Sequence, residues 1–217
     1  MSLPLFETEA QPPEIIDKGA VLLRGFAAAE DQRWVAEVAA LQAQAKFRVM
    51  QVPGGKSMSV AIINAGDWGW ISDVNGYRYS AVDPLTGKPW PSIPVFLHEQ
   101  AVAAAASAGY PGFAPDACLI NRYQPGARMG LHRDQDEADF AAPIVSVSLG
   151  LPCTFLWGGL ARQNPVKRLV LTHGDALVWG GPSRLVFHGV SPLKEGLHHL
   201  LGSERWNLTF RMAKRAL

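Results

Sequence analysis

The sequence predicts a mainly β fold with flanking helices, of the sandwich, barrel or jelly-roll kind. Its 217 residues, 48% of them hydrophobic, suit one domain with a substantial core. Two segments of helical pattern come first, and a series of short strands divided by turns follows Asp116, which is typical of antiparallel β architectures. The expected strands of this second part are Ala117–Tyr123, Ile144–Leu149, Thr154–Trp157, Arg168–Leu171, Ala176–Trp179, Leu185–His188 and Trp206–Met212.

The first elements are expected to be an arm, a strand and two helices. Residues 1–20 are acidic and contain a Pro-Pro pair, which predicts a loose arm, and the apolar residues 21–23 then predict a short buried strand. Residues 30–47 repeat apolar side chains at helical spacing, with Asp31 placed to favour the helix dipole. Residues 95–108 form an alanine-rich helical segment that ends before a glycine and a proline.

Between the two helices the sequence alternates turn residues with aromatic residues. Segments of this composition form hairpins and loops. We therefore divide the chain into an arm at 1–20, an extension at 21–115 and a β core at 116–217, within a single structural domain. The aromatic residues of the extension are Trp68, Trp70, Tyr77, Tyr79 and Trp90.

Charge and cysteine content exclude several classes of protein. The formal net charge of +1 divides into −3 for residues 1–110 and +4 for residues 111–217, a split too small to establish a polyanionic partner. Cys118 and Cys153 lie far apart in apolar stretches, which suits core thiols and not a disulfide scaffold. No secretory leader pattern and no apolar stretch near 20 residues are present, so we expect a monomeric cytoplasmic protein without a membrane.

Two His-x-Asp motifs are candidates for metal binding. His132 and Asp134 point the same way if their segment is extended, so both can reach one cation. His173 and Asp175 have the same spacing, but their Thr-His-Gly-Asp sequence predicts a turn. His188 ends an apolar run, as a hydrogen-bonded core histidine or as a third ligand. Two imidazoles and one carboxylate suit iron(II) with oxygen, whereas four protein ligands would suit structural zinc.

The segment RWNLTFR, residues 205–211, predicts a strand with one apolar and one polar face. Alternation places Arg205, Asn207, Thr209 and Arg211 on the polar face. A surface-facing polar row is one interpretation. The other is a site for a dicarboxylate such as 2-oxoglutarate, because each guanidinium offers a planar fork that matches a carboxylate. The strand before Gln124 adds Asn121 and Tyr123 on one face.

Together these segments resemble the AlkB family of demethylating dioxygenases over nearly the whole chain after about Val21. The likeness rests on PDACLINRY, LHRDQDE, PIVSVSLGLP, HGDALVWGG, RLVFHGV and RWNLTFR, with shorter matches upstream. It implies a double-stranded β-helix, which is a jelly roll, with an N-terminal nucleotide-recognition lid. It also implies iron(II) held by His132, Asp134 and His188, and O2 as oxidant. The residues implied for 2-oxoglutarate are Asn121, Tyr123, Arg205, Asn207 and Arg211.

The resemblance further implies a substrate site in the lid. Trp70 and Tyr77 correspond to contacts with the substrate base and its phosphate, and Asp136 and Arg162 look like the polar residues of the base pocket. Lys56 and Ile62 depart from the family pattern, in which an aromatic residue and a methionine are expected. These departures leave the chemistry intact and put the detailed substrate preference in doubt.

The function implied is the repair of methylated single- or double-stranded DNA, or RNA. 1-Methyladenine and 3-methylcytosine would be oxidatively demethylated, with release of formaldehyde, succinate and CO2. One alternative is an iron(II)/2-oxoglutarate hydroxylase that acts on a protein or a small molecule. A non-catalytic nucleic-acid-binding module is a second alternative, which the presence of all three ligands and both arginines disfavours.

Overall fold

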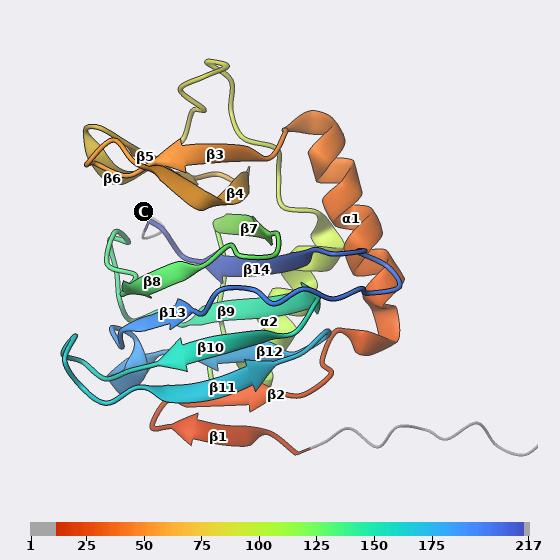
Figure 1. Cartoon of the computed structure of the whole chain (residues 1–217), viewed down its shortest axis with the longest axis vertical. Helices are drawn as coiled ribbons and strands as arrows, with labels where there is room; N and C mark the ends of the chain where they lie inside the picture. Colours follow the sequence, from red (N-terminus) through yellow and green to blue (C-terminus); the bar gives the residue numbers. More distant parts are fainter. Residues whose placement is uncertain (1–11, 215–217) are drawn as a thin grey trace, which may run out of the picture.

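The computed structural model describes residues 12–214, which form two stacked β-sheets with helices on one side (Figure 1). The large sheet has the order β1-β2-β12-β9-β14-β7-β4-β3 and the small sheet the order β11-β10-β13-β8. Strands β5 and β6 form a separate hairpin. The elements are β1 Glu14–Asp17, β2 Ala20–Leu23, η1 Ala28–Glu30, α1 Asp31–Gln44, β3 Arg48–Gln51, β4 Ser57–Gly66, β5 Gly69–Asp73, β6 Gly76–Ser80, α2 Val95–Ser107, β7 Ala117–Tyr123, β8 Met129–His132, β9 Ile144–Gly150, β10 Cys153–Trp157, β11 Lys167–Leu171, β12 Ala176–Trp179, η2 Gly181–Ser183, β13 His188–Val190 and β14 Arg205–Arg211.

This architecture confirms the mainly β prediction and its jelly-roll form. Both sheets pair their strands in antiparallel fashion. Strands β7 and β12 have the predicted bounds, and the two helices occupy the segments expected for them. The aromatic, turn-rich segment contains the β5–β6 hairpin, as its composition predicts.

Two local predictions are wrong. The strand expected at Leu185–His188 begins, rather than ends, at His188, because the preceding residues form a turn in which the N–H of Val186 bonds to the carbonyl of Ser183. An apolar run is buried equally well in a turn or in a strand, so its composition does not distinguish them. The arm expected to be loose includes strand β1, which pairs with β2, while residues 1–11 lie outside the described part.

The extension and the core share one sheet. Strands β2, β3 and β4 come from the extension, and β4 pairs directly with the core strand β7. The boundary at residue 115 therefore separates segments of sequence, whereas the large sheet runs across it.

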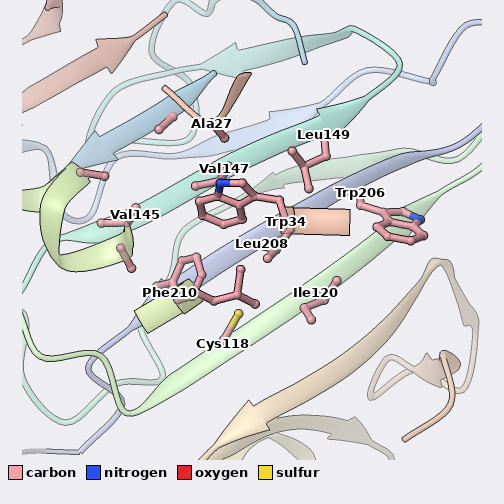
Figure 2. Close-up of a cluster of buried hydrophobic side chains, with 14 of the residues drawn as sticks. Ala27, Trp34, Cys118, Ile120, Val145, Val147, Leu149, Trp206, Leu208 and Phe210 are labelled. Carbon is pink, nitrogen blue, oxygen red and sulfur yellow. The ribbon is translucent and has the colours of Figure 1, made fainter. Parts of the chain in front are cut away.

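The helices cover the outer face of the large sheet. In Figure 1, α2 lies behind this sheet and the small sheet lies in front of it. Trp34 of α1 packs edge-on against Phe210 of β14, at 6.4 Å between ring centroids. Trp206 and Leu208 belong to the same cluster, so the apolar side chains of β14 all face the helices (Figure 2).

The opposite face of β14 therefore points between the two sheets. A second apolar cluster fills this space, and it includes Leu119 of the large sheet and Phe155 of the small sheet. The functional site lies in the same interior, where side chains are shielded from water on both sides. No helix within residues 12–214 is long and apolar enough to cross a membrane.

Candidate metal centre and co-substrate pocket

The small sheet brings His132, Asp134 and His188 together. His132 ends β8 and His188 begins β13, and the two residues are paired in register. The Nε2 atoms of His132 and His188 lie 3.8 and 3.6 Å from the carboxylate oxygens of Asp134. The candidate ligand atoms of all three residues lie within 4.8 Å of one another, so one cation can contact all three.

Backbone carbonyls set both imidazoles in the tautomer that a metal requires. Nδ1 of His132 lies 2.9 Å from the carbonyl of Gly130, and Nδ1 of His188 lies 3.0 Å from that of Val186. Because a carbonyl only accepts, Nδ1 carries the proton in each neutral ring and Nε2 keeps its lone pair. Burial, together with the nearby His132, lowers the pKa of His188 to about 4, so His188 is neutral at pH 7, as metal binding requires.

Asp134 is a carboxylate at neutral pH although it is buried. Burial alone would raise its pKa, but the Arg211 guanidinium and the two imidazoles outweigh that effect and hold the pKa well below its usual value. Nη2 of Arg211 forms an ion pair with Oδ2 of Asp134 at 2.8 Å. This buried Oδ2 accepts no well-formed hydrogen bond within the described residues, which fits an atom that keeps a lone pair for a cation.

The polar row of β14 lies inside the protein, so the surface-facing interpretation is wrong. Arg205 and Arg211 are both buried. A cavity of about 680 Å³ opens beside the metal triad, a size in the range of small-molecule sites. Its wall includes four of the five predicted 2-oxoglutarate contacts, namely Asn121, Tyr123, Asn207 and Arg211.

Arg205, the fifth, is not on the cavity wall itself, but it lies next to Tyr123, which is. Its Nη2 donates to Oγ of Ser148 at 2.9 Å, and its guanidinium lies 5.1 Å from the centre of the Tyr123 ring. Its Nε and Nη1, and Nε of Arg211, are buried without a hydrogen-bond partner within the described residues. Buried unpaired donors cost free energy, so these three nitrogens fit an anionic co-substrate bound next to them.

The four predicted substrate residues line the same cavity as the metal triad. Trp70 and Tyr77 of the β5–β6 hairpin are stacked, with 5.5 Å between ring centroids and 13° between planes. Nε1 of Trp70 donates to Oδ2 of Asp136 at 2.8 Å. The Arg162 guanidinium lies 5.8 Å from the centre of the Phe187 ring, which is also on the wall.

Several supporting residues were missed by sequence reasoning. Ser146 and Ser148, given no role there, accept hydrogen bonds from Asn207 and Arg205. Their alternation along a strand was a usable signal, because β9 pairs with β14 and brings their polar faces together. Glu137 and Arg184 form a buried ion pair at 3.1 Å, which no pattern in the sequence predicts.

Fold and site together define a metal-dependent oxygenase that uses a dicarboxylate co-substrate, and comparison with known proteins agrees. Residues 19–211 match the model of the 2OG-Fe(II) oxygenase superfamily. The chain is 53% identical to the "Alpha-ketoglutarate-dependent dioxygenase AlkB" of Escherichia coli, over 97% of this chain and 98% of that protein. It therefore belongs to the AlkB family of iron(II)- and 2-oxoglutarate-dependent dioxygenases.

Two further relatives extend the comparison. The solved structure titled "The structure of OsALKBH1" matches with a TM-score of 0.79 and 30% identity, over 92% of this chain and 99% of that one. The human "Nucleic acid dioxygenase ALKBH1" is 37% identical over 129 residues, which cover 57% of this chain and 32% of that protein.

Proposed function

We propose that this dioxygenase repairs alkylated DNA by oxidative demethylation of 1-methyladenine and 3-methylcytosine, and the DNA-versus-RNA preference is a question for the assay below. The observation that carries the proposal is the position of Trp70, Tyr77 and Asp136 on the wall of the cavity that also contains the metal triad. When bound, iron(II), 2-oxoglutarate and O2 supply the oxidation that hydroxylates an N-methyl group, with release of succinate, CO2 and then formaldehyde. The human relative named as a nucleic acid dioxygenase supports a nucleic-acid substrate.

The cavity wall has the chemistry that selects a methylated base. Adenine methylated at N1 and cytosine methylated at N3 are cations, and cations bind favourably to aromatic faces and to carboxylates. Trp70 offers an indole face, and its hydrogen bond to Asp136 fixes the carboxylate beside that face. A base in a duplex must first leave the stack, at a cost of a few kcal/mol that stacking on Trp70 offsets.

The two buried arginines support different roles toward 2-oxoglutarate. Arg211 is already paired with Asp134 and Glu137, at 2.8 and 3.1 Å, and keeps one unpartnered N–H, on Nε. Arg205 keeps two unpartnered N–H-bearing nitrogens and has no ion pair among the described residues. We therefore assign the carboxylate farther from the metal to Arg205, and a contact near the metal to Arg211.

The test is a turnover assay on chemically defined oligonucleotides. Purified protein with iron(II), 2-oxoglutarate and O2 is given single- and double-stranded DNA and RNA that contain 1-methyladenine or 3-methylcytosine, with unmethylated strands as controls. We expect loss of one methyl mass per lesion and formation of succinate and formaldehyde. If 2-oxoglutarate is turned over but every methylated strand is unchanged, while a known demethylase succeeds, the substrate is a protein or a small molecule.

Two variants at Trp70 test the proposed base contact. Trp70→Ala removes the stacking surface, and stacking contributes about 1–3 kcal/mol per base, so kcat/KM for the methylated strand should fall about 5- to 150-fold. Trp70→Phe keeps a stacking face and loses only the hydrogen bond to Asp136, so it should lose less. Equal losses in both variants would contradict a stacking role.

The oligomeric state and the cellular compartment stay predictions. We propose a monomer that acts in the cytoplasm. Light scattering of the purified chain tests the first part, because a monomer of 23.5 kDa is easily distinguished from a dimer.

A further inference from the structure

The segment that carries Asp134 has no regular secondary structure. Residues 133–143 connect β8 to β9 without forming a helix or a strand, yet they carry a metal ligand and the substrate-facing Asp136. One backbone hydrogen bond, from Ala138 to the carbonyl of Ala213, ties the middle of this loop to the rest of the chain. A ligand on such a loop needs side chains to fix its position, because metal sites tolerate little displacement.

Arg184 contacts the loop at three separate points. Its Nη1 donates to the carbonyl of Asp134 at 2.9 Å, and its Nε donates to the carbonyl of Ala142 at 3.1 Å. Its Nη2 forms an ion pair with Oε2 of Glu137 at 3.1 Å. The arginine is only 3% exposed, so these contacts form away from water. One planar guanidinium thus binds the start, the middle and the end of the loop.

Glu137 links this arrangement to the co-substrate strand and the lid. Its side chain is fully buried, and its Oε1 accepts hydrogen bonds from the hydroxyl of Tyr79 at 2.9 Å and from Nη1 of Arg211 at 3.1 Å. Two carboxylates, of Asp134 and Glu137, are thereby balanced by two guanidiniums, of Arg184 and Arg211. Removing one guanidinium leaves buried negative charge without compensation next to the metal ligand.

We propose that Arg184 is a positioning residue for the metal centre. It holds the backbone of Asp134 directly and braces the loop through Ala142 and Glu137, so that the Asp134 carboxylate faces the two imidazoles. The side chain of Arg184 belongs neither to the three ligands nor to the cavity wall. The inference concerns metal binding, so it holds or fails independently of which methylated substrate the protein uses.

Metal binding and stability must be measured together, because any buried arginine can contribute to folding alone. Arg24 supplies a matched control, since it also binds two acids and a carbonyl: Glu14 at 3.1 Å, Asp175 at 2.8 Å and the carbonyl of Val170 at 2.8 Å. Its contacts lie on β1, β11 and the turn before β12, and it takes no part in the metal site. Arg24 is more exposed than Arg184, so its replacement tests general stability more than desolvation.

The experiment compares Arg184→Lys with Arg24→Lys in the full chain. Lysine keeps the charge but cannot bind three acceptors in one plane. Co(II), whose visible spectrum reports coordination, is titrated into metal-free protein. Outer contacts of metal ligands typically contribute about 10- to 100-fold in affinity, so Arg184→Lys should raise the Kd by that factor and alter the Co(II) spectrum. Arg24→Lys should leave both as in the wild type, even where it lowers Tm.

Two results would overturn the proposal. One is a folded Arg184→Lys protein that binds Co(II) with the wild-type Kd and spectrum. The other is an equal loss in Arg24→Lys, which would make the effect one of general stability. If Arg184→Lys does not fold, Glu137→Gln decides, because its amide oxygen still accepts from Tyr79 and Arg211, while its amide NH2 replaces the oxygen that pairs with Arg184. A rise in Kd, on the order of tenfold, supports the proposal, and an unchanged Kd refutes it.

Discussion

The chain contains two His-x-Asp motifs that look alike in sequence and do different things in the structure. In the first, His132 and Asp134 converge with His188. In the second, His173 contacts Asp31 of α1 at 3.2 Å, while Asp175 turns away to accept hydrogen bonds from Arg24, Gly25 and Thr172. The side chains of the first motif therefore place their ligand atoms close together, whereas those of the second motif point to different partners.

The protonation of the imidazoles explains the difference. Nδ1 of His132 faces a carbonyl, so Nε2 keeps a lone pair for a metal. Nδ1 of His173 instead accepts from the N–H of Gly150 at 2.9 Å, so the proton of the neutral ring lies on Nε2 and points to Asp31. His173 therefore cannot offer Nε2 to a cation without losing its backbone hydrogen bond. The backbone group that contacts Nδ1 therefore distinguishes the two histidines: a carbonyl at His132 leaves Nε2 free for a metal, and an N–H at His173 does not.

The largest expected effect comes from replacing the aspartate of the first motif, Asp134, by alanine. The same change at Asp175, in the second motif, is the comparison. Asp134→Ala removes a ligand, so turnover should fall by more than about 100-fold, beyond the range of outer contacts. His132→Ala should do the same. Asp175→Ala should keep near-normal turnover and lose about 3 kcal/mol of unfolding free energy, because a buried acid that pairs with Arg24 and three further donors is removed.

Turnover, urea unfolding and Co(II) stoichiometry check both variants. The wild type and Asp175→Ala should bind one tight Co(II) per chain and Asp134→Ala none. Full turnover in Asp134→Ala, or a second tight site that Asp175→Ala abolishes, would reverse the assignment of the two motifs.

Part of the site could be predicted from the sequence, because some of its features are local. Strand alternation correctly placed Arg205, Asn207 and Arg211 on one face, and it placed Trp206 on the other. The turn expected at His173 is also present. These features depend on the period of a strand or the chemistry of a turn, which a short segment determines by itself.

The remaining features depend on contacts between distant segments. Arg184 reaches back to Asp134, 50 positions earlier, and nothing near Arg184 indicates that partner. The position of His188 at the start of a strand depends on pairing with β8 and β10, and the run Leu185–Phe187 shows only that the segment is buried. Strand β1 likewise exists through pairing with β2, which its four residues, two acids and two isoleucines, do not predict.

A smaller effect is expected in the pH dependence of the metal-free protein. His188 has a pKa of about 4 in the fold, below the ordinary value of 6.5, because it is buried beside His132. Between these pH values the imidazole of His188 is protonated in the unfolded chain and neutral in the folded chain. The free energy of unfolding therefore falls as the pH drops from about 6.5 to about 4. At about 1.4 kcal/mol per pKa unit, the loss reaches about 3 kcal/mol.

Urea unfolding at several pH values, with a chelator present, measures this slope. His188→Gln replaces the imidazole by a neutral group, so its stability should depend less on pH over the same range, whatever its absolute value. Parallel curves for the two proteins would show that His188 is not responsible.

The smallest effect is expected from a second group of histidines, His173, His198 and His199, whose rings contact one another and are less buried than the ring of His188. The pKa of His198 is also lowered, first by burial and then by His173 and His199, while Asp31 acts in the opposite direction. The sign is therefore that of His188, with stability lost as the pH falls below about 6.5. His198 is partly exposed and stacks on His173 with 4.3 Å between ring centroids, so water screens its charge. His198→Asn should therefore reduce the pH dependence of the urea unfolding midpoint less than His188→Gln does. A larger reduction would mean that the second group of histidines, and not the metal site, dominates the loss of stability in acid.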